Sequence, residues 1–183
     1  QPPREDAITA LRNKILERAC LRYNSQAVIF LFAANNFRLK GLRELILAQS
    51  KAAQIASTPL VLAVAGKGKP SSWRNLAWLK GIDSQIVFLG PLPDMDTALE
   101  AADAVVLPTW YDPSSRFILE ALAAGKPVIT TTLNGAAEFV RHGRHGFVID
   151  RPADIVPLAD ALVRLSKREI RQSMTQAIAE DNL

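Results

Sequence analysis

Short apolar segments alternate along the chain with longer segments in which apolar and polar residues recur at helical spacing. The apolar segments are rich in valine, isoleucine and leucine and predict buried strands, at residues 26–34, 59–66, 84–90, 103–109, 126–132 and 145–150. The amphipathic segments predict helices, at residues 40–56, 71–81, 94–102, 114–125, 135–143, 153–167 and 168–180. Apolar strands that alternate with helices predict an α/β fold, a Rossmann-like, doubly wound parallel sheet of about six strands.

Individual residues indicate where two of these helices begin and which side chains pack in the core. Ser71 is expected to cap the helix that it opens, and Pro157 is expected to mark the start of the regular part of its helix. Trp73 and Trp78 lie on a predicted helix and are expected to pack against the core. Cys20, the single cysteine, is flanked by apolar residues and is expected to be a small core residue.

The chain divides into a leading segment and one domain. Residues 1–25 are polar and predict a linker helix, whereas residues 26–183 contain the strand–helix alternation. A length of 183 residues suits one domain with a substantial core. The chain begins with Gln1 rather than methionine, so we expect a domain cut from a longer protein.

The composition is typical of a soluble globular protein, with 49% hydrophobic and 22% charged residues. No apolar run approaches the roughly 20 residues that span a bilayer. The net charge of +4 comes without a basic stripe interleaved with aromatic residues, so no nucleic-acid partner is expected. This charge is compatible with an anionic ligand or an acidic membrane surface, and the single cysteine fits a reducing cytoplasm.

In parallel sheets of this kind ligands bind at the carboxyl ends of the strands, so the loops that follow the strands are the candidate site. Arg38 and Lys40 lie in such a loop beside a helix start, an arrangement that favours phosphate. The alternative is that both are solvated loop charges. The segment "GKGKP" at residues 66–70 lacks the spacing of a phosphate-binding loop and is better interpreted as a tight turn.

Two further pairs of residues have both a functional and a structural interpretation. His142 and His145 are three positions apart, but no carboxylate or cysteine falls at ligand spacing, so a polar turn is favoured over a metal pair. Trp110 and Tyr111 follow a predicted strand, and lining a pocket and covering the core are equally compatible with that position.

Asp112 and Glu120 are two carboxylates separated by a mostly apolar helical segment. If the helix begins at Ser114 or Ser115, Asp112 lies in the loop at its mouth and Glu120 lies nearly two turns in. Both carboxylates can then border one crevice and bind ligand hydroxyls. The alternative is structural: Asp112 forms a turn before Pro113, and Glu120 pairs with Arg116. The local sequence does not decide between these interpretations.

Several segments in order resemble a known family. They are "FLFAANNFRLKGLRELILA", "VIFLGPLPDMDTALEAADAVVLPTWYDPSSRFILEALAAGKPVITT" and "NGAAEFVRHGRHGFVI". Together they resemble the carboxyl-terminal domain of retaining GT-B glycosyltransferases, group one or family four, over roughly residues 25–165. Among subgroups, the lipopolysaccharide-core-type glucosyltransferases look most similar. The resemblance implies that the chain forms one half of a GT-B fold.

The resemblance also implies roles for the carboxylates and the loop cation. Glu120 would hold the ribose of a nucleotide sugar, Asp112 would hold hydroxyls of the donor sugar, and Lys40 would neutralise the diphosphate. The backbone N–H groups of Arg116 and Phe117 would receive the diphosphate. The family usually has glutamate at the position of Asp112, so the shorter side chain puts the identity of the donor sugar in question.

Other implied donor contacts involve less specific residues. The backbone near Leu92 would meet the base, and Ser114 and Ser115 would border the sugar. Many members have an arginine five residues before the lysine, where this chain has Asn35. Arg38 is the candidate substitute for that arginine.

The function implied by the resemblance is the transfer of a hexose from a nucleotide-diphosphate sugar, with a UDP-sugar favoured, without a bound metal or other cofactor. The acceptor would be a lipopolysaccharide or other cell-envelope glycan or glycolipid. The protein would be cytoplasmic, with peripheral contact at the inner face of the membrane left open. The amino-terminal acceptor domain would be absent from the chain, so the isolated domain is expected not to transfer sugar and to bind nucleotide weakly at most. The alternatives are a GT-B sugar-nucleotide epimerase and a degenerate domain kept for interaction.

Overall fold

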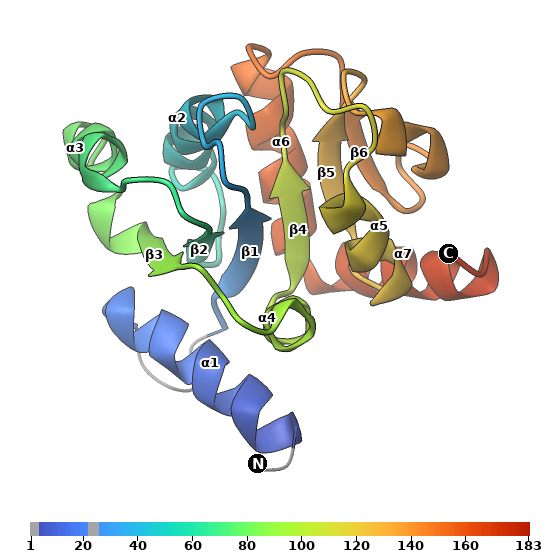
Figure 1. The fold of residues 1–183 in the computed structure, drawn as a ribbon, viewed down its shortest axis with the longest axis horizontal. Coiled ribbons are helices and arrows are strands. Elements are labelled where there is room, and N and C mark those ends of the chain that lie inside the picture. Colours follow the sequence, from blue (N-terminus) through green and yellow to red (C-terminus); the bar gives the residue numbers. More distant parts are fainter. Residues whose placement is uncertain (1–3, 22–25) are drawn as a thin grey trace.

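Six parallel strands form one sheet in the computed structural model, which describes residues 4–21 and 26–183 (Figure 1). The strands are β1 (Val28–Ala33), β2 (Leu60–Ala65), β3 (Ile86–Gly90), β4 (Ala104–Leu107), β5 (Val128–Thr131) and β6 (Gly146–Ile149). Their order across the sheet is β3-β2-β1-β4-β5-β6, and every pair is parallel. The predicted fold class is confirmed.

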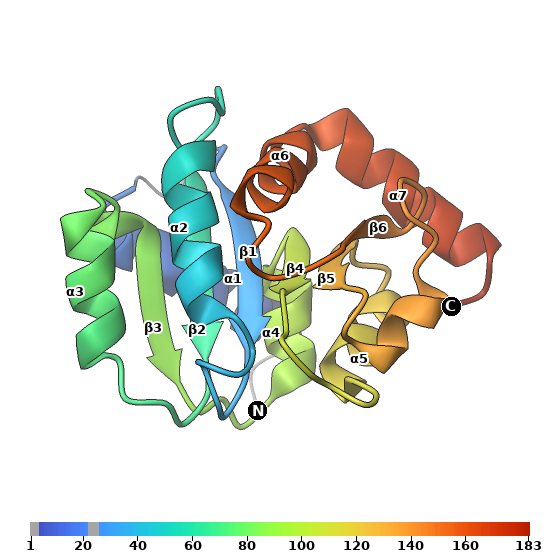
Figure 2. The same cartoon turned by 90° about the horizontal axis from the view of Figure 1, so that it is seen from above.

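Helices cover both faces of the sheet (Figure 2). They are α1 (Arg4–Arg18), α2 (Leu42–Ala52), α3 (Ser71–Leu79), α4 (Met95–Ala101), α5 (Arg116–Ala123), α6 (Ile155–Ser166) and α7 (Arg168–Glu180), with short 3₁₀ helices η1 (Asp83–Gln85) and η2 (Gly135–Phe139). Helix α2 packs against α6 and α3 on one face, and α1 packs against α4 on the other. None of the helices within the described part of the chain is long and apolar enough to cross a bilayer.

The core lies between the sheet and these two helical layers. All six residues of β2 are buried, and so are five of the six in β1, including Phe30 and Phe32. Both faces of these strands are therefore removed from water, as the unbroken apolar runs predict. Full burial of a large apolar side chain contributes about 1.5–3 kcal/mol. The sheet is thus a rigid base for the loops at its carboxyl edge.

The strand order reverses between β1 and β4. The chain moves outward from β1 through β2 to β3, then returns to the other side of β1 and continues through β4, β5 and β6. The loops after β1 and β4 therefore diverge and leave a crevice between them. Residues far apart in sequence meet there, at the upper edge of the sheet in Figure 1.

Several sequence-based details are wrong, each for a local reason. Pro70 already has helical dihedral angles, φ −82° and ψ −12°, so Ser71 lies inside α3 and its side chain makes no capping hydrogen bond. Helix α6 begins at Ile155, which makes Pro157 its third residue rather than its start. Cys20 is exposed because it adopts a left-handed conformation just beyond α1. The predicted helix at residues 135–143 is only the short η2.

The two tryptophans on α3 behave differently from each other. Trp73 packs against the core, with its ring 6.5 Å from that of Phe37 in an edge-on arrangement. Trp78 is 70% exposed, which contradicts the expectation that it packs. Trp78 lies on the outer face of a surface helix. The helical pattern alone does not show which face a residue occupies, so the prediction that Trp78 packs was wrong.

The leading segment is packed onto the domain. Ile15 and Leu16 of α1 are buried, and Arg12 donates a hydrogen bond to the carbonyl of Ala101 at 2.8 Å. Arg12 also pairs with Asp103 at 3.0 Å. Residues 1–3 and 22–25 of the predicted linker helix lie outside the described residues. The helix that the structure describes is therefore tied to the sheet by both apolar and ionic contacts.

Candidate functional site

The loop between β1 and α2 lies directly against the end of β4. Gly41 has a φ of +78°, and a side chain there would collide with the carbonyl oxygen of Pro108. Only glycine combines this conformation with such a close approach. The preceding residue, Lys40, is thereby directed across the crevice toward the segment that follows β4.

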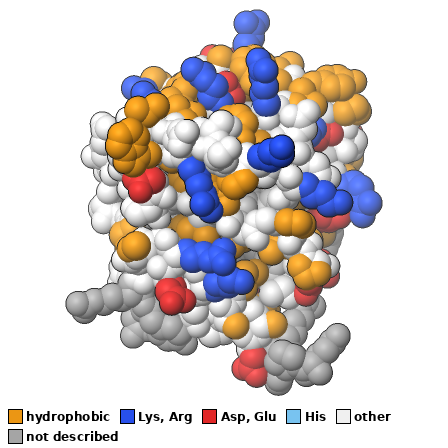
Figure 3. Space-filling model, turned by 60° about the vertical axis from the view of Figure 1, so that its left-hand side comes forward, with side chains coloured by type: hydrophobic (Ala, Val, Ile, Leu, Met, Phe, Trp, Pro, Cys, Tyr) orange, Lys and Arg blue, Asp and Glu red, His pale blue; other side chains and the backbone are white. Residues whose placement is uncertain are grey.

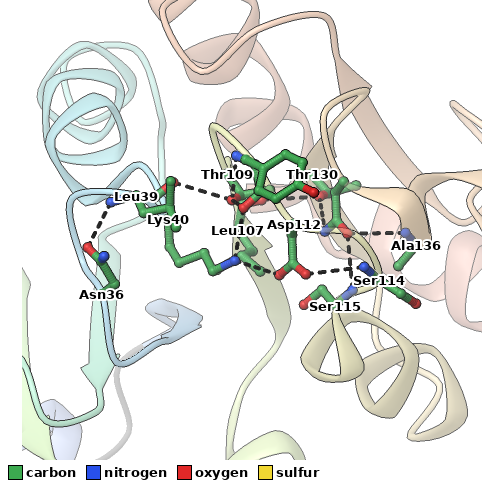
Figure 4. A network of polar contacts seen from close by, with 12 residues as sticks. Asn36, Leu39, Lys40, Leu107, Thr109, Asp112, Ser114, Ser115, Thr130 and Ala136 are labelled. Carbon is green, nitrogen blue, oxygen red and sulfur yellow. Dashed lines mark hydrogen bonds and ion pairs between the residues drawn. The ribbon is translucent and has the colours of Figure 1, made fainter.

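Lys40 meets Asp112 across the crevice (Figure 4). The Lys40 Nζ lies 2.8 Å from Asp112 Oδ2 and donates a second hydrogen bond, 3.0 Å long, to the carbonyl of Tyr111. The two side chains are only 20% and 14% exposed. The fold thus joins a cation from the β1 loop and a carboxylate from the β4 loop into a shielded pair at the switch point.

The backbone around Asp112 is held by the loop that follows β5. The Asp112 N–H donates to the carbonyl of Leu133 at 3.1 Å, and the Gly135 N–H donates to the carbonyl of Asp112 at 2.8 Å. The Ser114 N–H donates to Asp112 Oδ1 at 3.3 Å, which forms the turn expected of an aspartate before proline. Asp112 is therefore fixed in position while one of its oxygens faces Lys40.

Asn134 is a buried polar residue that sequence analysis missed. Its Oδ1 accepts hydrogen bonds from the N–H groups of Ser115, at 3.2 Å, and Ala136, at 3.1 Å. Its Nδ2 donates to Thr130 Oγ1 at 2.9 Å. An Asn-Gly pair after a strand could have indicated a cap, but not that it reaches back to the start of α5. A satisfied buried network of this kind holds the two loops in one arrangement.

The start of α5 supplies backbone donors near the crevice. Ser115 is its buried N-cap residue and makes no side-chain capping bond, whereas Ser114 is exposed. The N–H groups of Arg116 and Phe117 belong to the first turn, where no carbonyl of the helix can accept them. The positive end of the helix dipole adds to their attraction for an anion.

A cavity of about 440 Å³ lies beside these donors. It brings together four of the predicted donor-binding residues: Leu92, Arg116, Phe117 and Glu120. The other lining residues come from the ends of β1 and β2, the loops that follow these strands, the loop before α4 and the first residue of α4. They are Ala33, Ala34, Asn35, Ala65, Gly66, Lys67, Pro91 and Met95. Lys67 belongs to the segment interpreted as a tight turn, so the same segment also contributes a cation to the cavity.

Glu120 keeps access to this cavity. Its side chain is 40% exposed, and Oε1 lies 3.3 Å from Arg116 Nη2. The arginine side chain is 90% exposed, so this pair is surrounded by water and contributes little stability. Both structural contacts considered from the sequence, the turn at Asp112 and this pair, are present. They do not remove either carboxylate from the crevice region.

Arg38 lies in a different hollow from Glu120. This second hollow has a volume of about 460 Å³ and is lined by Asn36, Arg38, Leu39, Arg43, Glu44 and Trp110; we call it the Trp110 pocket. Trp110 therefore lines a pocket, while Tyr111 is 63% exposed. Lys40 and Asp112 line neither hollow, but residues close to them in sequence do: Leu39 and Trp110 line the Trp110 pocket, and Arg116 lines the cavity.

His145 belongs to a structural network at the opposite end of the sheet, whereas the Nδ1 of His142 accepts a hydrogen bond from the Val148 N–H at 3.2 Å. His145 is buried, and its Nε2 lies 2.7 Å from Asp181 Oδ2, at the end of α7. Arg144 and Arg141 contact the same carboxylate, each at 2.9 Å. Hydrogen bonds from Arg144 and His145 hold the pKa of the Asp181 carboxyl well below its usual range. This network anchors the carboxyl-terminal helix rather than forming a metal pair.

Basic side chains are unevenly distributed over the surface. Figure 3 shows that lysines and arginines outnumber acidic residues on the side of the molecule formed by α3 and β3. On that side, Arg18, Arg74 and Trp78 line another hollow of about 650 Å³. Arg18 donates to the carbonyl of Phe88 at 3.3 Å, and the Arg74 guanidinium lies 5.6 Å from the centre of the Phe88 ring. Both cations thus already have partners within the protein.

Comparison with proteins of known sequence places these features in a family. The family model described as glycosyl transferases group 1 matches residues 26–168. The lipopolysaccharide glucosyltransferase WaaG of Escherichia coli K12 is 28% identical over 152 residues, covering 83% of this chain and 38% of the relative. The uncharacterized glycosyltransferase MJ1607 of Methanocaldococcus jannaschii is 30% identical over 136 residues, covering 73% and 34%. The chain thus spans less than half the length of these relatives.

Solved structures agree with this assignment. The crystal structure of WaaG superposes with a TM-score of 0.80 and 25% identity, over 98% of this chain and 46% of that protein. The carboxyl-terminal domain of LpcC, a group 1 family protein from Francisella tularensis, superposes with a TM-score of 0.72 and 21% identity, over 92% and 89%. The resemblance drawn from the sequence is confirmed: the chain belongs to the glycosyl transferases group 1 family and has the fold of a GT-B half.

Proposed function

We propose that this chain is the nucleotide-sugar-binding half of a retaining glycosyltransferase that transfers a hexose from a UDP-sugar. One observation carries the proposal. The cavity lined by Glu120 and the first turn of α5 lies next to the shielded Lys40–Asp112 pair, at the switch point of the sheet. A carboxylate for ribose hydroxyls, free N–H groups for a diphosphate and a cation beside them suit a nucleotide-diphosphate sugar.

Each part of the donor has a matching part of the cavity. Glu120 accepts hydrogen bonds from the ribose hydroxyls, and the backbone near Leu92 meets the base. The diphosphate lies against the N–H groups of Arg116 and Phe117, with Lys40 and Lys67 as the nearby cations. Ser114 and Ser115 border the sugar at the mouth of the crevice. This arrangement needs no metal, because fixed positive charge and N–H groups neutralise the diphosphate.

The chemical role of the pair follows from where charge develops. When the glycosidic bond breaks, the diphosphate leaves with additional negative charge. Preorganised donors aimed at that charge stabilise the transition state more than the ground state. Lys40 supplies such a charge, and Asp112 holds it in place while accepting a hydrogen bond from a sugar hydroxyl. Asp112 is thus the residue that links the cation to the donor sugar.

Much of the acceptor site would come from the rest of the protein. Because the chain spans less than half of its relatives, a second domain facing this crevice would complete the site. The name of the relative WaaG supports a lipopolysaccharide or other cell-envelope glycan as the acceptor. Such an acceptor is reached at the inner face of the cytoplasmic membrane. The isolated chain is expected to bind nucleotide without transferring sugar.

Calorimetric titration of UDP, GDP and ADP tests the proposal. We expect UDP to bind most tightly, and Glu120→Ala to weaken it about tenfold or more, since hydrogen bonds to a charged group contribute about 1.5–3 kcal/mol. Glu138→Ala is the matched control, because Glu138 is an exposed carboxylate outside the cavity lining. Absence of binding by all three nucleotides would favour the interaction role instead. Equal affinity in Glu120→Ala and the parent would refute the ribose contact.

A further inference from the structure

The Trp110 pocket has the composition of a sugar-binding subsite. Trp110 is 40% exposed and offers an aromatic surface, on which a sugar ring can stack. Asn36 and Glu44 add polar side chains that hydrogen-bond hydroxyl groups. An apolar surface with a few converging polar groups is typical of small-molecule sites.

Glu44 is the most informative residue of this pocket. Its side chain is nine-tenths buried, and its one ionic contact among the described residues is with Arg43 Nη1 at 3.7 Å. That distance is too long for a hydrogen bond. A buried carboxylate usually has hydrogen-bonding partners, because desolvation without them is costly. Glu44 therefore has acceptor capacity that a ligand in the pocket can satisfy.

The cations of the pocket have spare capacity as well. Within residues 4–21 and 26–183, the Arg38 side chain makes no hydrogen bond or ion pair, and the Arg43 side chain pairs only with Glu44. Two arginines against one carboxylate leave the pocket with an excess of positive charge. Guanidinium groups bind phosphate and carboxylate through paired hydrogen bonds. The pocket thus combines sites for hydroxyl groups with a site for an anion.

The position of the pocket identifies which sugar it can hold. The Trp110 pocket and the donor cavity have no lining residue in common. Trp110 precedes Asp112 by two residues, and Leu39 directly precedes Lys40. A sugar held in this pocket therefore lies next to the Lys40–Asp112 pair but outside the nucleotide cavity. That position suits the acceptor rather than the donor.

We propose that the Trp110 pocket is an acceptor subsite for a sugar unit that carries an anionic substituent, a phosphate or a carboxylate. Trp110 stacks on the ring, Glu44 and Asn36 hydrogen-bond its hydroxyl groups, and Arg38 and Arg43 bind the anionic substituent. This inference rests on the proposed function. It assigns part of acceptor recognition to the domain that holds the donor.

The hollow beside α3 provides an internal control of similar composition. It also contains a tryptophan and two arginines, Trp78, Arg18 and Arg74. Its arginines already contact Phe88, and the hollow adjoins β3 at the edge of the sheet. Non-specific attraction of anions to a basic surface would affect both places, whereas the proposed subsite requires only the Trp110 pocket.

The test is an NMR titration of the 183-residue chain saturated with UDP, so that the donor cavity is occupied. The probes are glucose 6-phosphate, glucuronate, glucose and inorganic phosphate; the readouts are the backbone N–H signals of Leu39 and Glu44, which every variant retains, and, in the parent, the indole N–H signal of Trp110. We expect both anionic sugars to shift these signals and to bind about tenfold more tightly than glucose or phosphate alone, because charged hydrogen bonds and ring stacking each contribute. A preference between the two anionic sugars identifies the substituent.

Variants of the Trp110 pocket and of the hollow beside α3 test whether binding of anionic sugars depends on the pocket. Trp110→Ala is expected to weaken anionic-sugar binding about tenfold, Trp110→Phe to retain it, and Arg38→Gln with Arg43→Gln to remove the preference for the anionic sugar. Trp78→Ala and Arg74→Gln, the matched controls, are expected to bind as the parent does. Equal binding in Trp110→Ala, or equal loss in the α3 controls, would overturn the proposal.

The donor and acceptor proposals can fail separately. UDP affinity is measured on every variant, and Trp110→Ala is expected to bind UDP as the parent does. If UDP binds but no anionic sugar shifts the Trp110 signal, the subsite is refuted while the donor site stands. If anionic sugars bind at Trp110 in a chain that does not bind UDP, the pocket is a sugar site and the proposed donor function is the part that fails.

Discussion

Two partly buried ion pairs lie at opposite ends of the sheet, and their surroundings differ. Arg12 and Asp103, at the amino edge, are joined at 3.0 Å and are also bonded to backbone groups: Arg12 to the carbonyl of Ala101, and Asp103 to the N–H of Ile29. Lys40 and Asp112, at the carboxyl edge, are joined at 2.8 Å. In the described residues, Lys40 uses two of its three donors.

The difference teaches that pairing alone does not mark function. At Arg12–Asp103 both side chains also hydrogen-bond to backbone groups, so the pair fastens α1 and the start of β4 to β1. At Lys40–Asp112 a donor remains on a shielded cation beside a cavity. We infer that a position at the switch point of the carboxyl edge, rather than the presence of two charges, distinguishes a binding pair from a structural one.

The largest expected effect comes from Lys40→Met in a protein that carries both GT-B halves. Loss of one preorganised charge at a reacting centre costs about 10²–10³-fold in kcat, so we expect a fall of that size. Steady-state transfer assays with a nucleotide-sugar donor measure it. The free energy of unfolding is also expected to fall, by about 2 kcal/mol, because Asp112 loses its ionic partner while it is only 14% exposed; kcat is therefore compared on the folded protein. A fully active Lys40→Met protein would contradict the catalytic role.

Arg12→Met is expected to lower stability without affecting nucleotide binding. It leaves Asp103 without its ionic partner at the domain's amino edge, so we expect the free energy of unfolding to fall by about 2 kcal/mol. Urea unfolding monitored by circular dichroism measures this loss. Calorimetry of UDP binding to the folded variant should give the parent affinity. A large loss of UDP affinity at unchanged stability would erase the distinction between the two pairs.

The smallest expected effect concerns the network around Asp181, which is structural like the Arg12–Asp103 pair. Because the native contacts lower the pKa of Asp181, its contribution to stability is present above the carboxyl's unfolded pKa of about 4 and is lost as pH falls below that value. We therefore expect the parent chain to lose more stability than Asp181→Asn between pH 6 and pH 3. Parallel urea titrations at these pH values provide the measurement. Equal slopes in both chains would show that the network does not stabilise the fold.

Much of the architecture follows from periodicity along the chain. Alternating apolar and amphipathic segments predicted the strands and most helices, since each signal is local. The loops after the strands were correctly identified as the place where Lys40, Asp112 and Glu120 converge at one edge. The family resemblance, rather than spacing, gave each of these residues a separate role.

The features that the sequence did not predict depend on contacts between segments that are distant along the chain. Asn134 reaches the start of α5, and Gly41 fits against Pro108, only because β4 lies between β1 and β5. Arg38 was placed with the donor residues because it is two positions from Lys40, yet it lines the other hollow. Neighbouring loop residues can point to different sides of a crevice, and the sequence carries no signal for that choice.

The way in which Asp112 is held has an evolutionary consequence. Its main chain is fixed by hydrogen bonds to Leu133 and Gly135, independently of its side chain. Exchange to glutamate, the residue usual in the family, would therefore move only the carboxylate further into the crevice. Codons for the two acids differ by a single nucleotide. If Asp112 holds the donor sugar as proposed, donor choice can thus be adjusted in one mutational step while the main chain of the loop stays in place, which makes this position a natural point of divergence between related enzymes.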